Sequence, residues 1–505
     1  MIKSFSRRRI TPTTPRLRRV IGFAERIPSF YKKGARSTIA DERLRFIAVD
    51  RELRYEPPRS ETELPAADHA TIERLFHCER SREPLRIIRT LRDRGFTAYF
   101  AGGCVRDALL GYEPKDFDVA TDATPDSIRD VFGHQRTLPF GASFGVIGVL
   151  PPRTRGGGIS PDQPTEVATF RSDGTYSDGR RPDSVHYGNA EQDAIRRDFT
   201  INGMFYDPHT HRVLDFVGGQ QDIRRGVLRT IGDPDLRFGE DKLRMLRAVR
   251  FTTTLRFQTD PDTAAAIRKL ADGIRQVSAE RIGGEMRRIL VAEGAIEGIR
   301  QLIETGLSRH IWPGIEGVDR QVAATLLREL PRDRRDGHLF PRTVACAIIP
   351  SADPSAILRS IAAAWRLSNE EQRQIASALR LWPLLASARQ RRWSELQPAL
   401  TDRDVEIAAD VAEAVVRSGW RPAYDPQSID RVREILSWPE SRRDPPPLLT
   451  GADLKRLGMP PGPAYRGILA EIRVAQLDGE LTTPEQAMCR ARAAIGDPSP
   501  RPDAE

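Results

Sequence analysis

The feature that most constrains the fold is the segment GGCVRDALLGYEPKDFDVATDATP at residues 102–125. A short apolar run, TAYFA, precedes it. The pattern predicts a strand that enters two glycines, a helix over CVRDALLG and a second strand over FDVATD. A further helix is expected over TPDSIRDVF, with Thr124 as its N-cap and Pro125 at its first position. This order of elements predicts an α+β unit with a mixed sheet.

Two acidic residues, Asp116 and Asp118, stand two positions apart in a strand-like stretch at the start of the second predicted strand. Side chains of a strand alternate between faces, so both carboxylates are expected on the same side. Mg²⁺ prefers oxygen ligands, and phosphoryl-transfer enzymes use two such ions about 3.5–4 Å apart. We therefore expect Asp116 and Asp118 to be catalytic metal ligands for two Mg²⁺ ions.

The residues around this pair make the prediction more specific, because D-x-D alone is common in solvated turns. Gly102 and Gly103 let backbone N–H groups approach a phosphate, and Arg106 can bind that phosphate with two N–H groups. Glu166 lies in the predicted strand TEVATFR. It is a candidate third carboxylate if that strand lies beside the D-x-D strand; the alternative is an exposed strand acid without a role.

Four charged residues recur at every third position in DPDLRFGEDKLRMLRAVRF: Asp241, Arg244, Arg247 and Arg250. On one predicted helix each step rotates by about 300°, so the row drifts by about 60° per step. Asp241 and Arg244 are then neighbours that can read one base edge, because the carboxylate accepts from the exocyclic amine of cytosine or adenine, which uracil lacks. Arg247 can reach a phosphate. Arg250 faces about 180° away from Asp241 and can instead contact the RNA backbone or a structural carboxylate.

The segment AIRRDFTINGMFYDP carries two adjacent arginines, Arg196 and Arg197. On a helix they diverge by about 100°, so at most one is expected to face the site. Asp198 and Asn202 form an i,i+4 pair that can brace the local structure, and Asp198 can alternatively be a simple cap.

Charge is distributed unevenly along the 505 residues, which carry a formal net charge of +9. Residues 1–40 hold eleven Lys and Arg and a single acid, Glu25. An RNA-binding arm, a transit-like peptide and a disordered leader all fit this composition. The four cysteines contain no C-x-x-C pair, which favours a reducing, cytoplasmic setting. No apolar run approaches the length of about 20 residues that a membrane helix needs.

Five motifs occur in order along the chain: GGCVRD, DFDVATDATP, EVATFRSDGTYSDGRRPDSV, RRDFTING and EDKLRMLRAVRF. Together they resemble the class II tRNA nucleotidyltransferase and bacterial poly(A) polymerase family. The resemblance implies a polymerase-β-like palm followed by an all-α neck, body and tail. Helical patterns do dominate after residue 190, and all six tryptophans follow residue 310, where they are expected to anchor a helical core. The expected ranges are an N-terminal extension at 1–82, a palm at 83–230, a neck at 231–300, an RNA-binding body and tail at 301–495, and a disordered end at 496–505.

Mapped onto this sequence, the resemblance gives roles to individual residues. It implies that Asp116 and Asp118 bind the metal ions and that Glu166 is the third catalytic carboxylate. It implies that Asp241 and Arg244 read the incoming base. The expected nucleotide-binding residues are Gly102, Gly103, Arg106, Arg197, Asp241, Arg244, Arg247 and Arg250.

The reaction implied is template-independent addition of CCA to the 3′ end of tRNA from CTP and ATP, with release of pyrophosphate. The stretches TLPFGASFGVIGV and LLTGADLKRLGMPPGPAYRGILAEI resemble CCA-adding enzymes more than poly(A) polymerases. Addition of poly(A), addition of only CC or only A, and a non-catalytic RNA-binding role stay open. Two features depart from the family pattern: Gly203 replaces the usual alanine, which is expected to be a mild change, and 151–164 lengthens a palm loop. The oligomeric state also stays open.

Overall fold

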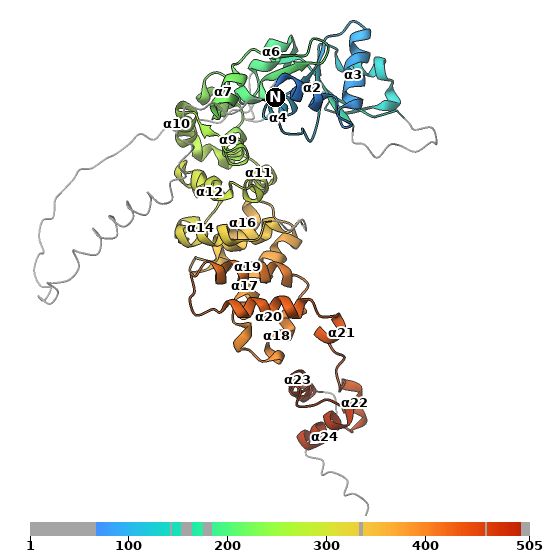
Figure 1. The fold of residues 1–505 in the computed structure, drawn as a ribbon, viewed down its shortest axis with the longest axis vertical. Helices are drawn as coiled ribbons and strands as arrows, with labels where there is room; N and C mark the ends of the chain where they lie inside the picture. The colour runs from blue at the N-terminus through green and yellow to red at the C-terminus, as the bar shows by residue number, and fades with distance from the viewer. Residues whose placement is uncertain are drawn as a thin grey trace, which may run out of the picture. The chain divides into compact units, whose positions relative to one another are not determined.

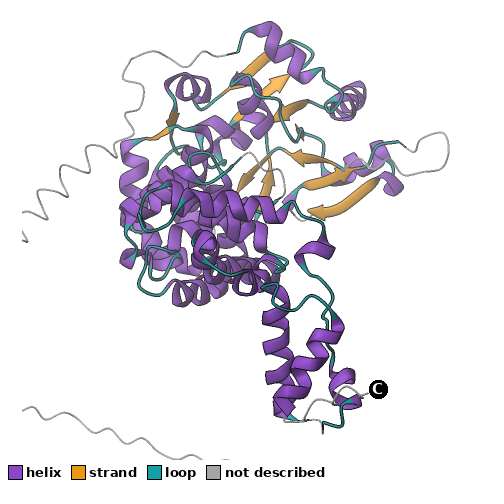
Figure 2. Cartoon of the chain, turned by 60° about the horizontal axis from the view of Figure 1, so that its bottom comes forward, coloured by secondary structure: helices purple, strands orange, loops and turns teal. Residues whose placement is uncertain are grey.

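The computed structural model describes residues 67–141, 144–152, 164–174, 184–332, 337–459 and 462–495 (Figure 1). The expected extension up to residue 66, most of the insert at 151–164 and the C-terminal segment 496–505 lie outside the described residues. Strands, drawn in orange in Figure 2, gather in the N-terminal part, and helices make up nearly all of the rest. This distribution agrees with the predicted α+β fold.

A seven-stranded mixed sheet forms the centre of the palm, with the order β3-β4-β5-β2-β1-β8-β9. The strand β2 runs parallel to β5 and antiparallel to β1. The inner strands β1 and β8 of the sheet are short and mostly apolar, as expected for strands that are buried on both faces. The strands span Ala98–Ala101 (β1), Asp118–Thr121 (β2), Thr137–Gly141 (β3), Val146–Val149 (β4), Thr165–Thr169 (β5), Met204–Asp207 (β8) and Arg212–Asp215 (β9).

Among the palm helices, α5 (Pro125–Phe132) follows the local rule that predicted its start. It begins after Thr124, whose side chain accepts the Ser127 N–H at 3.2 Å. The palm helices are α2 (His69–Phe76), α3 (Arg82–Asp93), α4 (Gly103–Leu109), α5, α6 (Ala190–Ile195) and α7 (Gly219–Arg225).

The palm begins earlier in the chain than expected, because α2 lies inside the range 1–82. The ring of Phe76 is fully buried and stacks on Tyr206 with centroids 4.1 Å apart. A helix of this length carries too few apolar positions for its role in the core to be read from the sequence. The expected boundary at residue 83 therefore cuts through the core of the palm.

The helix expected to carry Asp241 starts later than predicted. Helix α8 (Pro234–Glu240) ends before Asp241, and α9 (Leu243–Leu255) begins after it. Asp241 itself has extended backbone angles, φ −144° and ψ 108°, and its side chain accepts the N–H of Leu243 at 3.0 Å. An aspartate competes for backbone N–H groups in this way at helix starts. The row Asp241, Arg244, Arg247, Arg250 is therefore not carried by one continuous helix.

The neck packs around α9, which contacts α11 (Ala279–Val291) and α12 (Ala295–Glu304). A two-stranded parallel sheet of β10 (Val227–Leu228) and β11 (Gln258–Thr259) adjoins it. Helix α10 (Pro261–Leu270) packs against α8.

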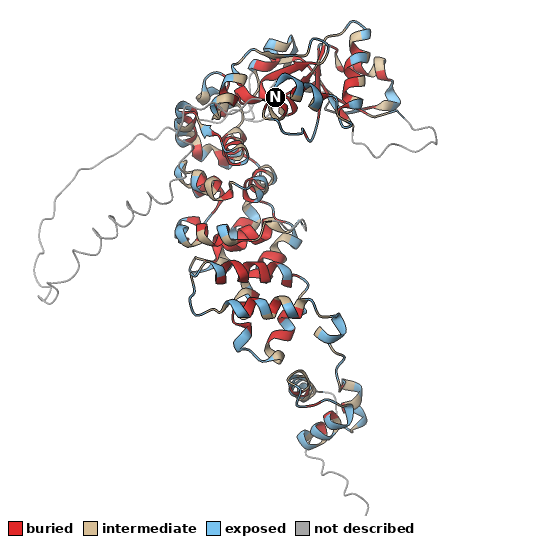
Figure 3. Cartoon of the chain, viewed as in Figure 1, coloured by how far each residue is buried: buried red, intermediate tan, exposed pale blue. Residues whose placement is uncertain are grey.

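The described part of the body contains helices and no strand, and two of its tryptophans are completely buried. The rings of Trp312 and Trp365 meet edge to face at 4.9 Å, and the indole N–H of Trp365 donates to the Ile311 carbonyl at 2.6 Å. Buried residues, red in Figure 3, concentrate in the palm sheet and around α17 and α19. The main body helices are α14 (Arg320–Glu329), α15 (Leu339–Ile348), α16 (Pro354–Ala364), α17 (Asn369–Ala386), α18 (Trp393–Leu400), α19 (Val405–Arg417), α20 (Pro426–Leu436) and α21 (Glu440–Arg443).

The tail has a hydrophobic cluster of its own, formed by α22 (Gly451–Arg456), α23 (Pro463–Leu477) and α24 (Pro484–Ile495). Hydrogen bonds join the tail, and also Asp444 directly after α21, to α18. The Asp478 carboxylate accepts from the Ser394 N–H at 2.9 Å and from its hydroxyl at 2.8 Å. The Gln397 amide donates to Asp444 at 2.8 Å. The tail core is thus not continuous with the core of the body.

The described part of the chain includes all four cysteines. None of its helices is long and apolar enough to cross a membrane. Its four cysteines are all free, and burial raises the pKa of both Cys104 and Cys346 to about 12.

Candidate active site

The two aspartates lie at the start of β2: Asp116 precedes the strand, and Asp118 is its first residue. Asp116 and Asp118 are both exposed, while Phe117 between them is buried. Asp118 is the first residue of β2 and pairs with Ala101, the residue directly before Gly102. Both carboxylates therefore reach the same open side of the sheet, next to the glycine turn.

Glu166 joins them from the neighbouring strand. The parallel pairing of Val119 with Val167 places Glu166 beside Asp118, and both side chains are exposed. Although Asp118 still reaches solvent, the protein atoms crowded around it raise its pKa to about 6. The charges of Glu166 and Asp116 raise it further, and that of Arg197 lowers it. Negative charge is thus concentrated at this edge of β2.

This donor set suits a hard divalent cation. Within the described residues, no three His, Cys, Asp or Glu side chains lie close enough together to hold a metal ion. Two carboxylates are enough for Mg²⁺, which commonly binds through one or two carboxylates and substrate phosphates. A cation between Asp116 and Asp118 would also relieve the repulsion that raises the Asp118 pKa.

The glycine turn before α4 requires glycine at its first position. Gly102 has φ +71° and ψ −123°, and a Cβ there would lie 2.8 Å from Nη1 of Arg197. Backbone and guanidinium can approach this closely only because the side chain is absent. The turn brings Arg197 next to the start of α4 and within electrostatic range of Asp118.

The adjacent arginines follow α6, which ends at Ile195, so the helical argument does not apply to them. Arg197 is the one next to Gly102. Arg197 lies over the ring of Phe205, and its Nη2 donates to Asp193 at 2.8 Å. Arg196 donates to the other oxygen of the same carboxylate at 2.6 Å. The buried Asp193 carboxylate thus bridges the two guanidinium groups, one on each of its oxygens.

The expected base-reading pair does not form a joint contact in the described structure. The Asp241 carboxylate accepts from Arg281 of α11 at 2.7 and 3.2 Å. Arg244 instead bonds to the Glu240 carboxylate and to the Arg237 carbonyl at 3.1 Å. Each reader is therefore held by a different neighbour. No sequence motif indicated Arg281. It lies 40 residues from Asp241, in a segment whose pattern predicts only a helix.

The two later arginines of the row are also paired. Arg247 donates to Asp198 at 2.8 and 2.6 Å. Arg250 donates to the buried carboxylate of Glu285 at 2.5 Å, and its guanidinium lies 3.9 Å from the ring centre of Phe251. Of the two contacts expected for Arg250, the structure contains the one with a structural carboxylate.

The packing around Gly203 is tight, so the difference from the usual alanine is larger than the mild change that we expected. A Cβ at this position would lie 2.7 Å from Cγ2 of Val217 and 3.0 Å from Cδ1 of Ile231. These neighbours occupy the space that an alanine methyl group would need. Restoring the alanine would therefore require both side chains to move.

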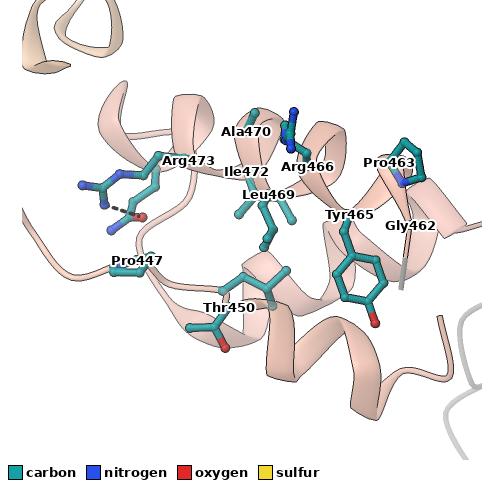
Figure 4. Close-up of a pocket in the computed structure, with 12 residues that line it drawn as sticks. Pro447, Thr450, Gly462, Pro463, Tyr465, Arg466, Leu469, Ala470, Ile472 and Arg473 are labelled. Carbon is teal, nitrogen blue, oxygen red and sulfur yellow. Dashed lines mark hydrogen bonds between the residues drawn. The ribbon is translucent and has the colours of Figure 1, made fainter. Parts of the chain in front are cut away.

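A separate groove lies in the tail, far along the chain from the palm site (Figure 4). It has a volume of about 1010 Å³ and runs between the segment around Leu449 and helix α23. Tyr465, Arg466 and Arg473 line it together with aliphatic side chains. The phenol of Tyr465 donates to the Met459 carbonyl at 2.7 Å, which fixes the ring.

Comparison with known proteins matches two family models to this chain. The Poly A polymerase head domain covers residues 98–229, and a probable RNA and SrmB-binding site of polymerase A covers residues 256–318. A CCA-adding enzyme of Geobacillus thermodenitrificans is 33% identical over 404 residues, which are 79% of this chain and 93% of the relative. The chain belongs to the CCA-adding enzyme family. The family resemblance of its five motifs is thereby confirmed.

Further CCA-adding enzymes agree in extent. The Geobacillus stearothermophilus protein is 33% identical over 405 residues, again 79% of this chain and 93% of the relative. The crystal structure of the Bacillus stearothermophilus CCA-adding enzyme in complex with CTP covers 83% of this chain and 100% of its own, with 28% identity and a TM-score of 0.65. The present chain is accordingly a nucleotidyltransferase, with a head domain and a helical body as predicted.

Proposed function

We propose that this chain adds CCA to the 3′ end of tRNA, using CTP and ATP and releasing pyrophosphate. The observation that carries the proposal is the 33% identity that extends over 93% of a CCA-adding enzyme. Placement of Asp116, Asp118 and Glu166 at one open edge of the sheet supports the chemistry. Poly(A) addition has the same head domain model in its favour.

Asp116 and Asp118 would hold two Mg²⁺ ions. When bound, these ions would supply activation of the RNA 3′-hydroxyl and neutralisation of charge on the leaving pyrophosphate. Glu166, beside Asp118, adds negative charge that favours cation binding. The backbone of Gly102 and Gly103 and the guanidinium groups of Arg106 and Arg197 hold the triphosphate.

Asp241 and Arg244 select the base. The Asp241 carboxylate accepts from the exocyclic amine of cytosine or adenine, and Arg244 donates to the acceptors of the same base edge. Their partners Arg281 and Glu240 hold the two side chains in place before the nucleotide arrives. Arg247 and Arg250 anchor α9 through Asp198 and Glu285, and so act on the nucleotide chiefly by positioning that helix.

The helical body and tail bind the RNA. The tail groove presents Arg466 and Arg473 beside the fixed ring of Tyr465. Arginine charge with an aromatic face suits RNA, where phosphates and unstacked bases are recognised together.

The test uses the full chain with Mg²⁺ and three RNAs: tRNA lacking its CCA end, tRNA ending in CC, and an unrelated RNA. Each is incubated with CTP and ATP, and the 3′ ends are sequenced. We expect CCA on the first, a single A on the second and little addition to the third. Long A tails on all three would favour a poly(A) polymerase. Addition of only CC or only A would indicate a split activity, and no addition would favour a non-catalytic RNA-binding protein.

A further inference from the structure

Asn202 lies at the end of a short 3-10 turn, Thr200–Asn202, between two charged groups of opposite sign. Its side-chain oxygen accepts from Nη1 of Arg106 at 2.7 Å, and its side-chain nitrogen donates to Asp198 at 3.0 Å. Arginine can only donate and an ionised carboxylate can only accept. The orientation of this amide is therefore dictated by its neighbours, and an amide satisfies both at once. The residue is buried, so neither bond is readily replaced by water.

On one side, Asn202 determines which N–H groups of Arg106 remain available. Arg106 also donates from Nε at 2.9 Å and from Nη2 at 2.7 Å to Asp107. Of the five N–H groups of an arginine, three are thus used within the described structure, and one remains on each terminal nitrogen. These two N–H groups are available to the oxygens of a phosphate. The contact with Asn202 stops the guanidinium from turning this pair away.

On the other side, the chain of contacts continues into the neck. The second oxygen of Asp198 accepts from both Nε and Nη2 of Arg247, at 2.8 and 2.6 Å. Arg247 belongs to α9 and lies three residues after Arg244, the proposed base reader. A continuous polar path therefore joins the phosphate-facing arginine of the palm to the helix that reads the base.

We propose that Asn202 is a positioning residue for nucleotidyl transfer, which orients Arg106 toward the triphosphate and links it through Asp198 to α9. This inference rests on the proposed function of the same site. The Asn202 side chain bonds to Arg106 and Asp198, and its effect on the triphosphate passes through Arg106.

The test is a double-mutant cycle of Asn202→Ala and Arg106→Ala. Binding of CTP and of ATP is measured by calorimetry, and KM and kcat are measured for addition of A to tRNA ending in CC. We expect Asn202→Ala to weaken nucleotide binding about tenfold, while KM for tRNA stays unchanged. In the Arg106→Ala background the same substitution should weaken it less than about twofold. An equal loss in both backgrounds would show that Asn202 does not act through Arg106 and would overturn the proposal.

Two further variants separate positioning from folding. Thr200→Val removes a buried hydrogen bond of the same turn, from the Thr200 hydroxyl to Asp222 at 2.7 Å, without touching Arg106. It should lower the melting temperature and leave nucleotide binding unchanged. If it weakens nucleotide binding as much as Asn202→Ala does, the turn rather than the amide is responsible and the proposal fails. Asn202→Asp keeps the acceptor for Arg106 but sets a second carboxylate against Asp198. Per folded molecule, it should still bind the nucleotide better than Asn202→Ala.

Nucleotide binding needs no transfer, so the two ideas can fail separately. A wild-type chain that binds CTP and ATP but adds nothing to tRNA would overturn the proposed function, and the cycle in binding would still decide the role of Asn202. A chain that adds CCA but shows an additive cycle would overturn only the role of Asn202. A chain that binds neither nucleotide would overturn both.

Discussion

The palm site and the body core use the same chemistry, arginine paired with carboxylate, to opposite ends. In the palm, Arg106 and Arg197 are held by Asp107 and Asp193 but remain partly accessible, which in the proposed function orients them toward the nucleotide. In the body, Arg342 of α15 and Asp410 of α19 are both fully buried and meet at 2.6 Å. Charge is kept near solvent where it must meet a substrate and is enclosed where it only joins helices.

This difference predicts that charge removal in the palm costs activity and that charge removal in the body costs stability. Loss of both activity and stability in Asp118→Asn or in Arg342→Met would break the distinction.

Asp118→Asn should show the largest effect. We expect nucleotide addition to fall by on the order of a thousandfold or more, because a metal ligand is lost. The melting temperature should stay equal or rise, because one of three crowded negative charges is removed. Initial rates of A addition to tRNA ending in CC, with thermal unfolding of the same sample, test this. Substantial remaining activity would contradict the role of Asp118.

Arg342→Met should lower stability and leave activity unchanged. It leaves the buried Asp410 with fewer partners, and breaking a buried ion pair costs about 3–5 kcal/mol. Urea unfolding should show this loss in free energy, while kcat per folded molecule stays unchanged. Arg300→Met is the matched control, since Arg300 pairs with Glu297 and Glu304 near the surface and should cost less than about 1 kcal/mol. Similar losses for both variants would contradict the contrast between enclosed and accessible pairs.

Asp198 supports the palm site, and its charge should contribute to stability by an amount between those of Arg342 and Arg300. Burial raises its pKa, but the charge of Arg247 and hydrogen bonds from Asn202 and Arg247 outweigh burial and bring the pKa to about 2. Because the folded pKa lies below the unfolded value of 3.8, this stabilisation is complete above pH 4 and is lost as the pH falls through 2. The loss is about 2 kcal/mol.

The free energy of unfolding of the wild type and of Asp198→Asn, measured at pH 5 and at pH 2, isolates this contribution. The difference between the two proteins should shrink by that amount at the lower pH. An unchanged difference would mean that Asp198 is not held ionised by Arg247.

Asp241→Ala should have the smallest effect on rate and act on selectivity. Loss of the carboxylate should reduce discrimination against UTP by about tenfold, because one base contact is worth about 1–3 kcal/mol. The ratio of kcat/KM for CTP and UTP measures it, with Arg281→Lys as a control that keeps a cation beside Asp241. If Asp241→Ala rejected UTP as strictly as the wild type, its base-reading role would be wrong.

Local rules predicted the features that depend on neighbouring residues. The exposure of Asp116 and Asp118 on either side of the buried Phe117 follows the expected alternation, although Asp116 precedes the strand. The Thr124 cap follows from side-chain chemistry. Asp241 failed as a helix position because capping competed with helix extension.

Contacts between distant segments could not be predicted in this way. Arg250 pairs with Glu285, 35 residues away, and Arg281 with Asp241, 40 residues away. Several carboxylates of the neck were equally plausible partners for each arginine. The packing around Gly203 likewise depends on Val217 and Ile231, whose positions only the fold determines.

The separate hydrophobic cluster of α22–α24 bears on how this chain opens under native conditions. A unit with its own core, attached through side chains such as Ser394 and Asp478, can unfold locally while the rest stays intact. Amide hydrogens of α23 should therefore exchange with solvent at a lower free energy of opening than those of α19. The tail would then behave as an independent cooperative unit, which could be shortened or exchanged without loss of the fold that carries the catalytic carboxylates.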